Sequence, residues 1–97
     1  MLLARVVGNL VATRKDPRLE GKKLLVLQLI TPQGKGKSGS YVVALDTVGA
    51  GANETVIAVQ GSSARMADGM KDIPVDAAVV GIVDQVDLDP PAKAKGS

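Results

Sequence analysis

The sequence predicts a small all-β protein: a five-stranded barrel with one short helix before the last strand. Runs of Val, Ile and Leu of strand length alternate with clusters of Gly, Pro, Asn and Ser. Two of these runs are apolar on both faces, and only one segment has both a start and a stop signal for a helix. We expect residues 1–89 to form one barrel domain and residues 90–97 to be a flexible polar tail.

The first predicted strand runs from Leu2 to Thr13, and its even-numbered positions are apolar or small. This alternation predicts one face toward the core. Gly8 lies on that face, where a missing side chain permits a bend of the kind found at barrel corners. Lys15, Asp16 and Pro17 break the pattern, and Glu20-Gly21 is typical of a turn.

The second predicted strand, Leu24 to Ile30, is apolar at both parities except for Gln28. A small antiparallel sheet normally leaves one face in water. Burying a large aliphatic side chain contributes about 1.5–3 kcal/mol, so an uncovered second face would be costly. Val79 to Val83 has the same two-sided character. We expect a neighbouring subunit, or the chain's own short helix, to cover these faces.

Between and after these runs, the sequence predicts an exposed, mobile loop at 31–40 and strands at 41–46, 54–60 and 77–88. A Gly-rich turn at 49–53 separates the third and fourth strands. Ser62 or Ser63 can cap a short helix that Gly69 ends. The nearest architecture is the five-stranded Greek-key barrel called the OB fold.

Composition restricts the classes of function. The 97 residues contain no His or Cys and a single aromatic, Tyr41, so the predicted core is aliphatic. The lack of Cys and of a signal sequence favours a cytosolic protein. Residues 1–40 carry eight Lys or Arg against two acids, whereas residues 41–89 carry two against eight. This asymmetry fits nucleic-acid binding or, as we favour, side-by-side packing of copies with complementary patches.

Three short motifs imitate catalytic or nucleotide sites. Gly36-Lys37-Ser38 resembles the end of a phosphate-binding loop, but Thr31 stands where the first glycine belongs. Gly49-Ala50-Gly51 begins like a dinucleotide fingerprint, but a strand follows where a helix is needed. Gly61-Ser62-Ser63 begins like a nucleophile elbow, yet no histidine exists to accept the serine proton. We therefore predict no catalytic residue and no cofactor.

Two charged features are weighed in the same way. Asp84, Asp87 and Asp89 match no metal-binding loop, and we predict no metal site there. Arg65 is one of two cations in the acidic half. It either makes a surface ion pair worth about 0–1 kcal/mol or bridges to an acid across a subunit boundary, and the sequence leaves both open.

Five ordered blocks resemble the EutN/CcmL family over Met1 to about Leu88. The blocks are Val11–Lys15, Leu19–Leu25, Asp46–Gly51, Gly61–Arg65 and Pro74–Asp84. The resemblance implies an OB-like barrel that assembles into a homopentamer, caps the vertices of an icosahedral bacterial microcompartment and contacts hexameric shell proteins. Asn53 and Thr55 depart from the family pattern.

The resemblance also implies which residues hold subunits together or shape the five-fold opening. These candidates are Asp46, Gly49, Gly51, Gly61, Ser62, Ser63, Arg65 and Asp76. A nucleic-acid-binding OB-fold module is the main alternative, although single-strand binders stack bases on aromatic side chains and only Tyr41 is available. A small hydrolase or transferase is the remaining option.

Overall fold

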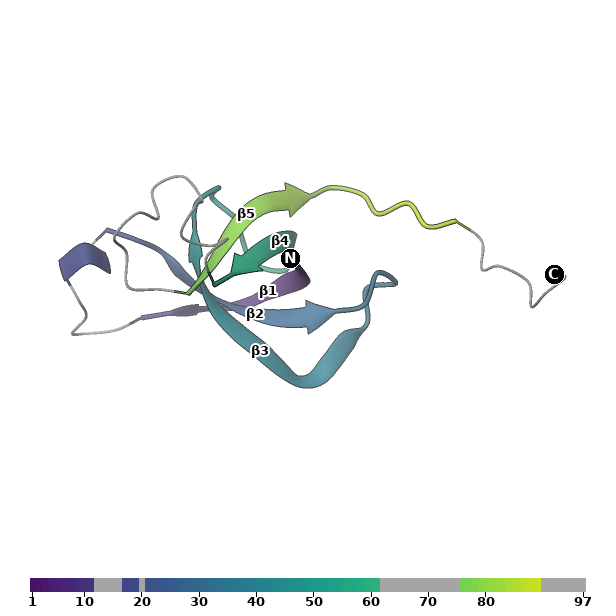
Figure 1. Ribbon diagram of the computed structural model, residues 1–97, viewed down its shortest axis with the longest axis horizontal. Helices are drawn as coiled ribbons and strands as arrows, with labels where there is room; N and C mark the ends of the chain where they lie inside the picture. Colours follow the sequence, from purple (N-terminus) through teal and green to yellow (C-terminus); the bar gives the residue numbers. More distant parts are fainter. Residues whose placement is uncertain (12–16, 20, 62–75, 90–97) are drawn as a thin grey trace, which may run out of the picture.

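The computed structural model describes residues 1–11, 17–19, 21–61 and 76–89, and only the backbone of 37 and 38. Within this part the chain forms a closed barrel with strand order β1-β2-β3-β5-β4 (Figure 1). The elements are β1 (Leu2–Leu10), a 3-10 turn η1 (Pro17–Leu19), β2 (Leu24–Ile30), β3 (Gly36–Asp46), β4 (Thr55–Gln60) and β5 (Ala77–Val83). The predicted all-β, five-stranded barrel is confirmed.

The main core lies inside the barrel and is aliphatic, as the composition predicts. Every strand contributes to it, and Leu25 and Leu27 of β2 are fully buried. The remaining members are mostly small: Ala4, Val6, Ala44, Ala50, Val56, Ala58, Ala77 and Val79. Small side chains suit a narrow barrel, since its interior has room for few large ones.

The alternation predicted for the first strand holds only as far as Val6. Val6 pairs with Leu27 and Gly8 pairs with Val26, so Val7 is an extra residue that forms a β-bulge. A bulge moves every later side chain to the opposite face. Leu10, predicted to face the core, is therefore on the outer face and 45% exposed. Strand β1 ends at Leu10, and Val11 is not part of it, so the predicted continuation to Thr13 is not seen. Residues 12 and 13 lie outside the described residues.

Strand β3 begins at Gly36, five residues before the predicted start, because Gly36 pairs with Ile30 of β2. The connection is thus shortened to residues 31–35. The Gly34 N–H donates to the Thr31 carbonyl at 2.8 Å, and the Arg5 guanidinium donates to the Gly34 carbonyl at 2.9 Å. The prediction of an exposed loop over 31–40 is corrected: its second half is strand.

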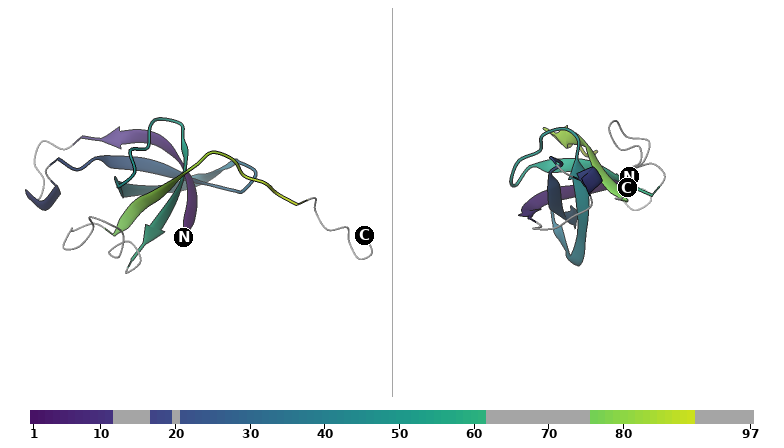
Figure 2. Two further views of the ribbon diagram at one scale, coloured as in Figure 1. Left: turned by 90° about the horizontal axis from the view of Figure 1, so that it is seen from above. Right: turned by 90° about the vertical axis from the view of Figure 1, so that its left-hand side faces the viewer.

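Strand β5 ends at Val83, not at the predicted Leu88. Val83 pairs with Thr55, the first residue of β4, so beyond this point β4 has no residue left to pair with. β3 does not replace it, because β3 and β5 pair only at Leu45 with Ala78 and Asp46 with Val79. Residues 84–89 leave the barrel as an exposed segment without regular structure (Figures 1 and 2).

The two-sided strand β2 is covered in part by its own chain. Leu24, on the second face, is buried in a separate apolar cluster with Leu19, Leu45, Val59 and Ala78. Ile30 is buried as well, and Val26 between them is half-buried. A neighbouring subunit is therefore not needed to bury Leu24 or Ile30, and for Leu24 the described cover is η1 and the adjoining strands. The predicted helix, the other cover expected, lies outside the described residues.

The predicted helix at 62–69 and the predicted tail at 90–97 lie outside the described residues. The sequence did not predict η1, which supplies the buried Leu19. No helix in the described ranges is long and apolar enough to cross a membrane.

Candidate assembly surface

The loop from Asp46 to Glu54, which joins β3 to β4, contains three of the predicted site residues. The Asp46 carboxylate accepts hydrogen bonds from the backbone N–H groups of Val48 and Gly49, each at 3.0 Å. This geometry closes a tight turn over the end of β3. Gly49 has φ +80°, a backbone conformation that strongly favours glycine. Val48 is exposed at the turn.

The second half of this loop is fixed by bonds to the barrel and by its own acid. The Glu54 carboxylate accepts from the Gly51 N–H, and the Lys23 ammonium donates to the Ala50 carbonyl at 3.0 Å. Ala50 is fully buried in the main core. The Asn53 N–H donates to the Val6 carbonyl at 2.9 Å. The loop thus has one shape, determined within the chain.

Asn53 has φ +66°, the only positive φ at a non-glycine position among the described residues. Asn tolerates the left-handed region better than most side chains. Asparagine therefore fits this turn position with less strain than most other side chains.

The other predicted site residues divide into two groups. The Gly61 N–H donates to the Asp76 carbonyl at 2.9 Å, which brings these two residues together where β4 ends and β5 begins. Asp76 is exposed. Ser62, Ser63 and Arg65 lie outside the described residues. Their assigned roles stay predictions.

The Asp46–Glu54 loop begins and ends at different places along β5, because Asp46 pairs with Val79 and Thr55, the residue after the loop, pairs with Val83. Thr47 donates through its hydroxyl to the Val79 carbonyl at 2.6 Å, which ties the end of β3 to β5. Val79 is three positions after Asp76 on the same short segment. The Asp46 end of the loop is thus tied to the first half of β5, which follows Asp76. The Glu54 end is not near the Gly61–Asp76 pair, because Thr55 and Gln60 are the two ends of β4.

Sequence reasoning missed Thr47, Glu54 and Lys23, whose side chains make hydrogen bonds that fix the Asp46–Glu54 loop. Glu54 had a local signal, since an acid three residues after a turn glycine can accept from its N–H. Lys23 had none, because it contacts Ala50 across 27 positions of sequence.

The outer face of β1, β2 and β3 presents a second feature, a group of exposed apolar side chains. The register places Val26 of β2 beside Val43 of β3, and Gln28 beside Tyr41. Val43 is 45% and Tyr41 56% exposed. A group of exposed apolar side chains on a small protein often marks an interaction surface.

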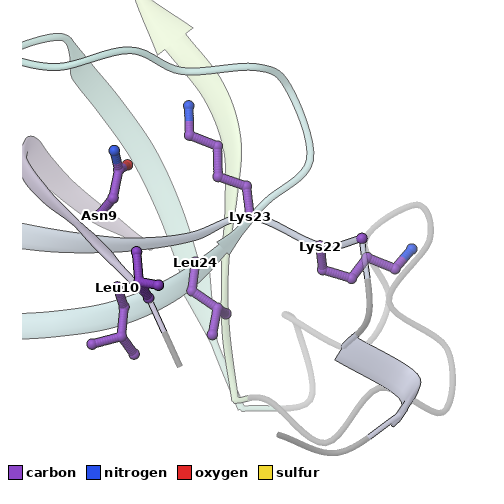
Figure 3. Close-up of a pocket in the computed structure, with 7 residues that line it drawn as sticks. Asn9, Leu10, Lys22, Lys23 and Leu24 are labelled. Atoms are coloured by element: carbon purple, nitrogen blue, oxygen red, sulfur yellow. The ribbon is translucent and has the colours of Figure 1, made fainter. Parts of the chain in front are cut away.

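Two hollows lined by described residues lack the features of a reaction site. One, of about 350 Å³, is lined by Asn9, Leu10, Val11, Gly21, Lys22, Lys23 and Leu24 (Figure 3). The Lys23 side chain points away from Leu10 and Leu24, toward the loop it binds (Figure 3). The other, of about 260 Å³, is lined by Met1, Leu2, Leu3 and Ile57. In the described part of the chain no cluster of His, Cys, Asp or Glu is arranged to hold a metal ion.

Comparison with known proteins identifies the class. The family described as "Ethanolamine utilisation protein EutN/carboxysome" matches residues 1–84. The carboxysome shell vertex protein CcmL of Synechocystis sp. is 48% identical over 88 residues, which cover 91% of this chain and 87% of that protein. The microcompartment shell vertex protein EutN of Escherichia coli is 46% identical over 86 residues, covering 89% of this chain and 90% of that protein.

A solved structure agrees with the sequence comparison. The GrpN pentameric microcompartment shell protein from Rhodospirillum rubrum superposes with a TM-score of 0.81 at 46% identity, over 92% of this chain and 100% of that one. The chain belongs to the EutN/CcmL family.

Proposed function

We propose that this protein is a structural, non-enzymatic vertex component of a bacterial microcompartment shell, in which five copies form a ring. The observation that carries the proposal is the family match over residues 1–84, together with relatives that are matched over most of both chains and are shell vertex proteins. One such relative is described as pentameric.

The role follows from geometry. Hexameric tiles that pack edge to edge make a flat layer, and a flat layer alone does not close. A five-fold unit at each corner supplies the curvature. We propose that the outer edges of the ring contact hexameric facet proteins, and that the protein is located in the shell.

The Asp46–Glu54 loop is suited to a contact that repeats identically in every copy. Its hydrogen bonds fix the exposed Val48 before assembly, so little conformational entropy is lost when the surface is covered. We assign Asp46, Gly49 and Gly51, and also Gly61 and Asp76, to subunit contacts or to the rim of the five-fold opening. Ser62, Ser63 and Arg65 are assigned the same role from the sequence alone.

The nucleic-acid alternative has weaker support. The relatives matched along the chain are shell vertex proteins. Base-stacking surfaces use several aromatic side chains, and Tyr41 is the only one in this sequence.

Native mass spectrometry tests the proposal directly. At micromolar concentration we expect one dominant species of five times the chain mass. A stable monomer under these conditions would overturn the proposed ring. A salt-dependent gel shift with single-stranded oligonucleotides, in a protein that stays monomeric, would instead favour the nucleic-acid function.

A further inference from the structure

One edge of β3 has almost no strand partner among the described residues. β3 pairs with β2 from Gly36 to Leu45, but with β5 at two positions only, Leu45 and Asp46. An unpaired strand edge presents backbone N–H and C=O groups that another strand can bind.

The direction of these groups follows from two hydrogen bonds. The Asp46 N–H donates to the Lys23 carbonyl next to β2, whereas the Thr47 N–H donates to the Val79 carbonyl of β5. Backbone groups alternate in direction along a strand, and the β2–β3 register is regular from Leu45 to Tyr41. The N–H and C=O of Val43 and Tyr41 therefore point to the open side. We call the backbone of Tyr41–Val43 on this side the β3 edge.

The same chain carries a strand-like segment without a partner. Residues 84–89, which we call the arm, follow β5 and are exposed throughout. Val86 is 43% and Leu88 53% exposed, and in an extended chain both lie on one side while Asp87 and Asp89 lie on the other. Among the described residues the side-chain hydrogen bond of the arm is local, from the Gln85 amide to the Asp87 carboxylate at 2.7 Å. The sequence predicted strand here, but β4 has no residue left to pair with beyond Thr55.

The charges near the β3 edge and those on the arm are complementary. The β2–β3 connection beside the β3 edge carries the exposed Lys35, and Arg5 is bound to its Gly34 carbonyl. The arm carries Asp84, Asp87 and Asp89. Complementary charge of this kind helps to orient two chains as they associate.

We propose that the arm of one copy adds as a strand to the β3 edge of a neighbouring copy in the ring, with Val86 and Leu88 against the exposed Tyr41 and Val43. The arm is exposed along its length, so it does not occupy the edge of its own barrel. Each copy gives an arm and receives one. Such a head-to-tail contact between different surfaces generates a ring when its rotation closes. This inference rests on the proposed pentamer and names the contact within it.

The first experiment compares two variants of the full-length chain by native mass spectrometry over a dilution series. Val86→Ser with Leu88→Ser removes the apolar side of the arm, while Gln85→Ser alters the opposite side of the same segment. For the double variant we expect the concentration at which half the pentamer dissociates to rise about tenfold or more, because each 1.4 kcal/mol of lost contact is a factor of ten. For the control we expect less than about a twofold change.

The outcomes separate the two proposals. If the wild type is pentameric and the double variant dissociates at the same concentration, the arm contact is wrong and the pentamer stands. If the wild type is monomeric, the proposed function itself fails. Equal weakening by both variants, or an unfolded double variant by circular dichroism, would also count against a specific apolar contact.

Disulfide trapping gives a second test that leaves the arm in place, and the natural chain has no cysteine to interfere. A chain with Val43→Cys is co-expressed with a differently tagged chain carrying Val86→Cys, and the oxidised product is separated by mass. We expect the mixed disulfide. A parallel co-expression pairs Val86→Cys with a chain carrying Val11→Cys. Val11 is 89% exposed and lines the hollow of Figure 3. If Val86→Cys links to this chain and not to Val43→Cys, the arm binds elsewhere and the β3 edge assignment is overturned.

Discussion

The Asp46–Glu54 loop and the arm at 84–89 both come at the end of a strand, and each combines acids with an exposed valine. Their structures differ because of their neighbours. The loop is bonded to β1, to β5 and to the residue before β2. Within the part of the chain that the structure describes, the hydrogen bond of the arm is local, between Gln85 and Asp87.

This difference shows that hydrogen-bond partners, and not composition, decide which surface segments of the barrel have a fixed conformation before assembly. A fixed loop presents one shape to a neighbour at little entropic cost, whereas an arm must be ordered by the neighbour it binds. Three pairs of substitutions test this contrast.

The largest effect is expected at Ala50, where the loop enters the core. Ala50→Leu places extra volume in a fully buried position and should lower the free energy of unfolding by about 1–3 kcal/mol. Ala52→Leu, at an exposed position of the same loop, should change it by less than about 0.5 kcal/mol. Denaturant titration at fixed protein concentration measures both. Equal effects would mean that the loop is not anchored through Ala50.

A smaller effect is expected at Asp46. Asp46→Ala removes the acceptor for two backbone N–H groups and should cost about 0.5–2 kcal/mol, as loss of a comparable side-chain cap does. Asp87→Ala removes an acid from the arm and should cost the barrel less than about 0.5 kcal/mol. Thermal unfolding of the two variants side by side gives the comparison. A larger loss for Asp87→Ala would contradict the view that the arm contributes nothing to the isolated barrel.

The smallest effect is expected at Asn53. Asn53→Gly keeps the backbone at φ +66° without strain and should change stability by less than about 0.5 kcal/mol. Asn53→Ala places a Cβ without a compensating polar group in the left-handed region and should cost about 1 kcal/mol. Calorimetry distinguishes them, and a stabilising alanine would show that the loop does not hold this backbone conformation.

Much of the fold could be predicted from local patterns. The inward face of β1 up to Val6 follows from period-two alternation, and the aliphatic core follows from composition. Strand β2 is apolar at both parities, so the pattern predicted the strand but not which of its faces is turned inward. The pattern failed at Val7, because a bulge is a property of two paired strands. The end of β5 at Val83 was missed for a similar reason: strand preference continues to Leu88, but the partner strand begins at Thr55.

The candidate site shows the same division. The Asp46 turn and the Asn53 position could be read from residue types whose bonding is local. Lys23 with Ala50, and Thr47 with Val79, are separated by 27 and 32 positions, and no local pattern reports such contacts.

By itself the sequence determined the all-β class, the aliphatic core, the turn residues and the family, because these depend on residue types and their spacing along one chain. The tertiary structure alone decided where each strand ends, which second-face residues the chain covers for itself, and which strand edge is left open. Those features depend on how far each pair of strands runs side by side, since a backbone hydrogen bond needs a partner that only the folded barrel puts in place.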